Sequence, residues 1–118
     1  LKNDPVIVYG NGFQTRDFTY IDDTVKSTLL VAEKCHGSEI INIAKGEDIS
    51  IQNLANNIIN ITKSSSVITN IDSPTHRFDF DPEKRCGDSK KLRQLTGYMP
   101  DTNLIEGLKK TYNDILHS

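Results

Sequence analysis

One short stretch gathers the side chains of this chain that are best suited to chemistry. It reads GNGFQTRDFTYIDD, from Gly10 to Asp23, and holds a turn signal, an Arg–Asp pair and a double acid. The guanidinium of Arg16 could pair with Asp17 on the surface, an interaction that contributes at most about 1 kcal/mol. It could instead bind an anionic ligand, because its planar fork of donors matches a phosphate group through two hydrogen bonds.

The double acid Asp22–Asp23 also has two interpretations. Paired carboxylates can serve acid–base chemistry or hold a hard cation. A run that reads as a helix follows directly, with Val25, Leu29 and Ala32 at helical spacing and Gly37 after it. Carboxylates at a helix start accept hydrogen bonds from free N–H groups and face the positive end of the dipole. We therefore expect the double acid to cap this helix.

The other reactive side chains are isolated in the sequence. Cys35 and His36 are neighbours, but no second histidine is placed to complete a dyad, and the three histidines lack the spacing of a metal site. The two cysteines form no CxxC motif. We expect no catalytic residue, no metal and no disulfide, and reduced thiols favour a cytoplasmic location.

Two motifs of redox enzymes are absent. Gly10 and Gly12 are followed by Thr15 where a dinucleotide-binding fingerprint needs glycine, and a strand pattern follows where that fingerprint needs a helix. No tyrosine is followed by lysine four residues later. We expect the chain by itself to bind no cofactor and to catalyse no redox chemistry.

The elements that position these residues alternate between strand and helix patterns. PVIVY ends in Gly-Asn-Gly, which predicts a hairpin with a returning strand over residues 15–21. The sequence indicates an α/β fold, a small mixed sheet with about four helices in a single domain over residues 1–118. The other predicted elements are a strand at 39–44 (EIINIA), a helix capped by Ser50, a strand at 67–71, a helix at 89–96 capped by Asp88 and ended by Gly97, and a last helix capped by Asp101 or Thr102.

Composition excludes several classes of function. Hydrophobic residues make up 36% and charged residues 25% of 118 residues, with a net charge of −2, so a folded domain without nonspecific affinity for nucleic acid or anionic membranes is expected. No apolar run approaches the roughly 20 residues that span a bilayer. The chain starts at Leu1 and enters a strand pattern almost at once. We expect it to be a fragment of a longer protein.

Four blocks, in order along the chain, resemble one enzyme family. YGNGFQTRDFTYIDDTV resembles the start of the C-terminal half of extended short-chain dehydrogenase/reductases of the nucleotide-sugar epimerase and dehydratase family. IINIAKGEDISIQNLANNI is similar to the family's "YNIG-G-x-x-x-S-I-x-E-L-A" block. GDSKKLRQLTGYMP is similar to "AD-x-SK-x-x-x-x-LGW-x-P", and NLIEGLKKTYN to "L-x-E-GL-x-x-T". The QTRDF element resembles most the UDP-glucose 4-epimerase branch.

The resemblance implies a ligand for the first block. In the family, the arginine of QTRDF contacts the diphosphate of the nucleotide sugar, and that arginine is Arg16 here. The strand before the glycine turn lies along the nucleotide base, at positions that correspond to Ile7, Val8 and Tyr9. The double acid remains a helix cap in this interpretation.

The second phosphate ligand is where the sequence departs from the family. The family has an arginine in an "R-P-G-D" stretch before the "AD-x-SK" block. Arg85 precedes Cys86-Gly87-Asp88, but Gly87-Asp88 better fills the later "AD" position. Arg77 is therefore the preferred candidate, with Asp79 on the ribose, and Arg85 stays open as the alternative.

By resemblance, the chain is the substrate-binding part of an NAD-dependent nucleotide-sugar epimerase or dehydratase that lacks its Rossmann half. The missing half would bind NAD and supply the catalytic Tyr and Lys, and the whole enzyme would oxidise and re-reduce the sugar at C4. The expected partners are a UDP-hexose and that half, with a monomeric fragment and a dimeric enzyme. Two alternatives stay open: a free-standing, non-catalytic binding module, and a dehydratase or reductase that acts on another sugar.

Overall fold

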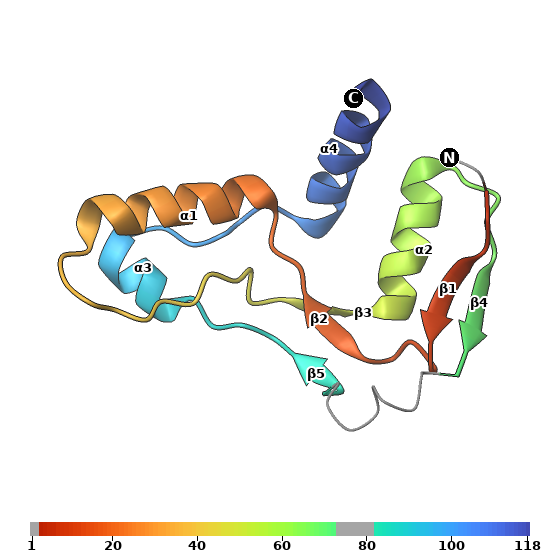
Figure 1. Ribbon diagram of the computed structural model, residues 1–118, viewed down its shortest axis with the longest axis horizontal. Helices are drawn as coiled ribbons and strands as arrows, with labels where there is room; N and C mark the ends of the chain where they lie inside the picture. The colour runs from red at the N-terminus through yellow and green to blue at the C-terminus, as the bar shows by residue number, and fades with distance from the viewer. Residues whose placement is uncertain (1–2, 73–81) are drawn as a thin grey trace.

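The structure is a computed structural model and describes residues 3–72 and 82–118. Figure 1 shows an elongated molecule with helices at one end, a helix beside paired strands at the other, and further short strands between them. This arrangement confirms the α/β class with four helices. The elements, in order, are β1 (Val6–Tyr9), β2 (Thr15–Asp17), α1 (Ile21–Lys34), β3 (Asp48–Ser50), α2 (Ile51–Thr62), β4 (Ile68–Ile71), β5 (Lys84–Arg85), α3 (Lys90–Thr96) and α4 (Leu104–His117).

The strands form two small sheets. β1 pairs in parallel with β4, from Val6 opposite Ile68 to Tyr9 opposite Ile71. β2 lies at the centre of the second sheet, antiparallel to β3 and parallel to β5. Because β1 and β2 belong to different sheets, the predicted hairpin is wrong, although a strand does begin at Thr15.

The glycine turn explains why the hairpin does not form. Gly10 and Gly12 do adopt positive φ angles of 66° and 74°. The carbonyl of Gly12, however, accepts a hydrogen bond from Gln52 N at 3.0 Å, and the carbonyl of Gln14 accepts one from Ile51 N at 3.1 Å. The turn therefore carries the chain to the start of α2 instead of returning it along β1 (Figure 1).

The predicted strand at residues 39–44 is also wrong, since the structure assigns no strand there. Ile40 is 88% exposed. The segment is held at its ends, where Lys91 Nζ donates to the carbonyl of Ile40 at 2.9 Å and the Ser89 hydroxyl accepts from Ala44 N at 2.8 Å. A buried apolar strand needs neighbouring strands to satisfy its backbone groups, and the described residues bring none beside it.

Local capping signals were more reliable than strand pairing. The Ser50 hydroxyl accepts from Asn53 N at 3.2 Å, which confirms its predicted cap, and Gly97 ends α3 with a φ of 77°. Asp88 accepts from Lys90 N at 2.8 Å at the start of α3. The last helix is capped by Asn103 and not by Asp101 or Thr102, because its carboxamide accepts from Ile105 N at 2.9 Å.

Part of the apolar surface of α1 lies outside the core of the described residues. Val25 is 50% and Leu29 is 65% exposed, whereas Asp23 and Ser27 on the same helix are buried. The helix was predicted correctly, but its apolar stripe faces away from the described residues. Over residues 3–72 and 82–118, no helix has the length and hydrophobicity needed to cross a membrane.

Candidate functional site

Arg16 lies in the middle of β2, the central strand of the three-stranded sheet. Its Nη1 donates to the carbonyl of Thr15 at 2.6 Å and to the carbonyl of Pro82 at 3.0 Å. The residue is half-buried. These two carbonyls orient the guanidinium and tie β2 to the segment that leads into β5.

The side chain of Asp17 makes different contacts from that of Arg16. Successive side chains of a strand point to opposite faces, so Asp17 lies on the face opposite Arg16. Its carboxylate accepts hydrogen bonds from the backbone N–H groups of Lys45, Gly46 and Gly87, at 3.2, 2.8 and 3.1 Å. The Asp17 carboxylate is therefore not the surface ion-pair partner of Arg16 that the sequence allowed. It joins two loops to β2 instead.

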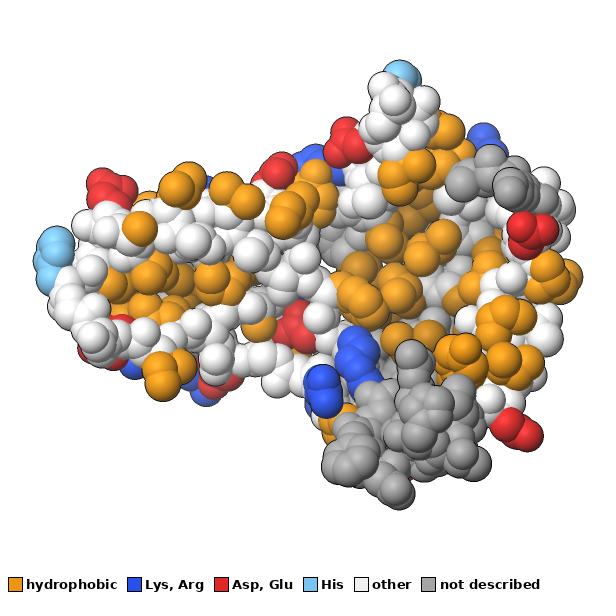
Figure 2. Space-filling view, in the orientation of Figure 1, with side chains coloured by type: hydrophobic (Ala, Val, Ile, Leu, Met, Phe, Trp, Pro, Cys, Tyr) orange, Lys and Arg blue, Asp and Glu red, His pale blue; other side chains and the backbone are white. Residues whose placement is uncertain are grey.

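The register of the sheet brings a second arginine beside Arg16. In the parallel pair of β2 with β5, Arg16 lies opposite Arg85 and Thr15 lies opposite Lys84. Registered residues of neighbouring strands share a face. Figure 2 shows basic side chains gathered over β2 and β5, beside the grey residues. Sequence reasoning kept Arg85 only as an alternative, because Gly87-Asp88 better fills the later "AD" position of the family block.

The three β1 residues that the resemblance places along the nucleotide base differ in exposure. Val8 is 2% exposed, so its side chain belongs to the core. Ile7 and Tyr9 are 48% and 39% exposed and share the other face. Gly10 N donates to the carbonyl of Ile71, and Val6 N to that of Val67. The backbone N–H and C=O groups of the even-numbered residues therefore point toward β4. The backbone groups of Ile7 therefore face the other edge of β1, where the described residues place no strand.

The remaining predicted site residues, Arg77 and Asp79, lie outside the described residues. Among the residues that the structure does describe, no three His, Cys, Asp or Glu side chains gather in a way that could hold a metal ion. Cys35 and Cys86 are free thiols. Burial, together with the carboxylates of Asp17 and Asp48, raises the pKa of the Cys86 thiol, which disfavours the nucleophilic thiolate at neutral pH.

The double acid is not a cap, which corrects that prediction. Helix α1 follows Tyr20, and no side chain caps it. Asp23 instead accepts a hydrogen bond from the Tyr98 hydroxyl at 2.7 Å and one from Thr102 N at 3.0 Å. It thereby anchors the segment between α3 and α4 onto α1. Asp22, in contrast, is exposed.

We expect Asp23→Ala to lower the free energy of unfolding by about 2 kcal/mol, because the part-buried Tyr98 hydroxyl and the Thr102 backbone N–H would lose their acceptor. Burial by itself would raise the pKa of Asp23, but the hydrogen bonds from Tyr98 and Thr102 outweigh burial and hold this pKa below its usual range. The stabilisation is therefore complete above about pH 4 and is lost as the pH falls through the lowered pKa.

Urea denaturation at pH 7 and pH 3 tests both parts of this prediction. Asp22→Ala is the matched control, since that neighbouring carboxylate is exposed and its loss should change stability by less than about 0.5 kcal/mol. Equal losses for the two variants, or a loss for Asp23→Ala that grows towards pH 3, would contradict the assignment.

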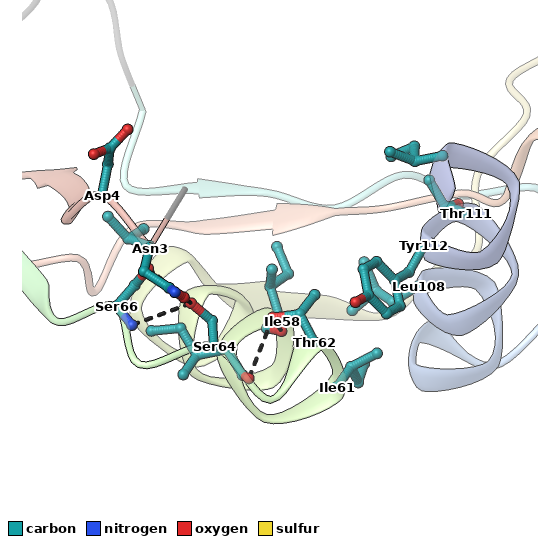
Figure 3. A pocket seen from close by; sticks show the side chains of 13 residues that line it. Asn3, Asp4, Ile58, Ile61, Thr62, Ser64, Ser66, Leu108, Thr111 and Tyr112 are labelled. Atoms are coloured by element: carbon teal, nitrogen blue, oxygen red, sulfur yellow. Dashed lines mark hydrogen bonds between the residues drawn. The ribbon is translucent and has the colours of Figure 1, made fainter. Parts of the chain in front are cut away.

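A groove lies away from Arg16, between α2 and α4. It has a volume of about 390 Å³, and Figure 3 shows Ile58 and Ile61 on α2 facing Leu108 and Tyr112 on α4. At its polar end the hydroxyl of Ser64 donates to the Asn3 carboxamide at 2.9 Å. Among the described residues that line it, Asp4 is the charged one. This lining is suited to apolar groups and not to a phosphate.

The chain is similar over most of its length to proteins named as nucleotide-sugar enzymes. A family model described as GDP-mannose 4,6 dehydratase matches residues 1–111. A UDP-N-acetyl-alpha-D-glucosaminuronate decarboxylase from Bacillus cytotoxicus is 36% identical over 114 residues, which cover 94% of this chain and 35% of that protein.

Two solved structures share the fold. The UDP-glucose 4-epimerase of Thermotoga maritima with UDP-glucose matches with a TM-score of 0.84 and 27% identity, over 98% of this chain and 37% of that one. The UDP-glucuronic acid 4-epimerase of Bacillus cereus, in complex with UDP-glucuronic acid and NAD, matches with a TM-score of 0.84 and 31% identity, over 98% and 36%. The chain thus spans about a third of the length of these relatives.

Proposed function

The chain belongs to the GDP-mannose 4,6 dehydratase family of nucleotide-sugar enzymes, and from this premise we propose that it forms the nucleotide-sugar-binding part of an NAD-dependent epimerase or decarboxylase. The observation that carries the proposal is the placement of Arg16, at the centre of a sheet with its guanidinium oriented by two carbonyls. A guanidinium held in this way can bind the diphosphate through two parallel hydrogen bonds. The diphosphate does not react, but its binding energy can position the sugar for reaction in another part of the enzyme.

The unpaired edge of β1 is the position at which the nucleotide base would bind. The N–H and C=O groups of Ile7 face this edge, and a pyrimidine such as uracil offers a complementary acceptor and donor. The exposed side chains of Ile7 and Tyr9 add apolar surface on one face of the strand. Val8 would take part only through its backbone, because its side chain is buried.

The glycine turn, within the described residues, does not fit NAD. Gly12 has a buried backbone on which an added Cβ would lie 2.9 Å from Val8 Cγ1, so this turn is packed against its own strand instead of forming a pyrophosphate cradle. We assign the cofactor and the catalytic tyrosine and lysine to a preceding Rossmann half. The NAD in the Bacillus cereus relative is consistent with such a division.

Two features of the fold favour that missing half as a partner. The exposed stripe of α1, with Val25 and Leu29, is an apolar face without a covering element in the described residues. Residues 39–44 have the composition of a buried strand but lie outside both sheets. An added sheet edge would pair with this segment and bury the α1 stripe. We place the whole enzyme in the cytoplasm as a dimer, and this single C-terminal domain, if isolated, as a monomer.

Sequencing the reading frame upstream of Leu1 separates this proposal from a free-standing module. We expect a GxxGxxG strand–helix unit and a Tyr-x-x-x-Lys motif there. A start codon at Leu1 would contradict the enzyme proposal.

The direct test is the affinity for UDP of the protein that the complete reading frame encodes. We expect Arg16→Ala to weaken UDP binding about 30-fold in calorimetry, because a charge-assisted hydrogen bond contributes roughly 2 kcal/mol. Arg93→Ala is the matched control, since Arg93 is exposed on α3. Unchanged UDP affinity in Arg16→Ala would refute the assignment of this site.

A further inference from the structure

The groove between α2 and α4 is open to solvent but is lined by side chains typical of a protein core. Two of these, Ile58 and Ile115, are 39% and 62% exposed. Apolar surface that is gathered in one place marks a contact site. Large apolar residues recur on both walls at intervals of three or four, as Ile58 and Ile61 on α2 and as Leu108, Tyr112 and Ile115 on α4 (Figure 3).

Hydroxyl groups along the groove are bonded to their own helices. Thr62 Oγ1 donates to the carbonyl of Ile58 at 2.8 Å, and Thr111 Oγ1 donates to the carbonyl of Gly107 at 2.9 Å. Small-molecule sites combine an apolar lining with a few polar groups that orient the ligand. Because these hydroxyls are turned to their own helices, the lining favours another apolar protein segment over an oriented small molecule.

The first described residues of the chain lie at the same groove. Asn3 and Asp4 are part of its lining (Figure 3). The Asn3 carboxamide accepts hydrogen bonds from Ser64 Oγ at 2.9 Å and from Ser65 N at 3.3 Å, which ties Asn3 to the loop after α2. Asn3 has a positive φ of 54°, a conformation that turns the chain and that asparagine tolerates. The turn before β1 is therefore fixed at the groove.

The inference rests on the proposed function, in which this chain is the C-terminal part of a longer enzyme. The chain spans about a third of the length of its relatives. In that enzyme, the segment directly upstream of Leu1 is tethered at the groove, and a short tether gives it an effective concentration of about millimolar or more. A second copy of the chain has no such advantage. The exposed stripe of α1 belongs to another helix and does not compete for this segment.

We propose that the segment directly upstream of Leu1 forms an amphipathic helix that packs into this groove, against α2 and α4. A helix satisfies its own backbone hydrogen bonds, whereas an extended segment would bury unpaired N–H and C=O groups against apolar side chains. Side-chain ridges of a helix also fit the grooves of its neighbours. Because β1 starts at Val6, shortly after Asn3, the docked helix fixes the start of the strand to which we assign the base.

Photo-cross-linking in the protein from the complete reading frame identifies the occupant. p-Benzoylphenylalanine in place of Tyr112 keeps an aromatic side chain in the groove and places a reactive ketone there. We expect irradiation to yield a cross-link within one chain, which mass spectrometry locates within about 20 residues upstream of Leu1, the length of a long globular helix. The same amino acid in place of Asn113, the exposed next residue outside the lining, is the matched control and should yield no such cross-link.

A charge placed in the groove provides a second measurement on the same protein. Ile115 and Leu116 are 62% and 55% exposed in this chain, but of the two Ile115 lines the groove. Under a docked helix, Ile115→Asp buries a carboxylate in apolar surroundings, so we expect its Tm to fall by about 5 °C or more. Leu116→Asp is the matched control and should shift the Tm by less than about 2 °C.

Three results of the cross-linking would overturn the proposal. A product of twice the mass would make a second copy of the chain the occupant. A cross-link to a segment farther upstream would assign the groove to another part of the same protein, and no cross-link would leave it open to solvent. Equal Tm shifts for the two aspartate variants would also contradict a covered groove. The UDP affinity of Arg16→Ala is measured independently, so each of these results leaves the proposed function to its own test.

Discussion

Replacing Asp17 with alanine is expected to lower the free energy of unfolding by about 3 kcal/mol, because three backbone N–H groups lose a charged acceptor. These groups belong to Lys45, Gly46 and Gly87, which lie in two loops far apart in the sequence. Asp17 is only half-buried, so water can replace part of each interaction. Without this partial replacement the loss would be larger.

Urea denaturation measures this loss, and Asp17→Asn is the informative partner variant. Its carboxamide keeps one acceptor oxygen, so we expect about half the loss of Asp17→Ala. Because the two loops also set the position of β5, we further expect Asp17→Ala to weaken UDP binding. A loss below about 0.5 kcal/mol, the range of ordinary surface substitutions, would show that these hydrogen bonds do not hold the loops.

Local signals in the sequence predicted local structure well. The cap by Ser50 and the end of α3 at Gly97 depend on residues within one helical turn, and both are confirmed. The hairpin failed for the opposite reason. Asn-Gly predicts a turn correctly, but the strand that pairs with β1 begins at Ile68, and no local pattern selects a partner at that distance.

The candidate site divides in the same way. Arg16 could be identified from its motif, and the structure adds the carbonyls that orient it. Arg85 could be evaluated only once the register of β5 was known. The prediction that Asp23 caps a helix is wrong. Its hydrogen-bond partner Tyr98 is 75 residues away, and no local pattern indicates a contact at that separation.

A side chain at Gly87 is expected to destabilise the fold strongly, because the contact of Gly87 with Ala44 leaves no room for it. A Cβ added at Gly87 would lie 2.2 Å from Ala44 Cβ, far inside van der Waals contact. We expect Gly87→Ala to lower the free energy of unfolding by about 3 kcal/mol, at the upper end of overpacking effects. The displaced backbone would also lengthen the hydrogen bond from Gly87 N to Asp17 and the one from Ala44 N to Ser89.

Exchanging the two residues should remove most of this loss. The family blocks that this chain resembles have glycine where this chain has Ala44, and alanine where it has Gly87. One methyl group thus fits between the two segments, on either side. We expect Ala44→Gly alone to cost about 1 kcal/mol, from backbone entropy and a lost buried methyl.

The double variant Ala44→Gly/Gly87→Ala should then be more stable than Gly87→Ala alone, which is the reverse of additive behaviour. Urea denaturation of the four proteins gives the coupling energy directly. Additive losses would show that the two segments do not touch. The contact between Gly87 and Ala44 also sets the position of β5 beside β2. We therefore expect UDP binding to fall in Gly87→Ala and to return in the double variant.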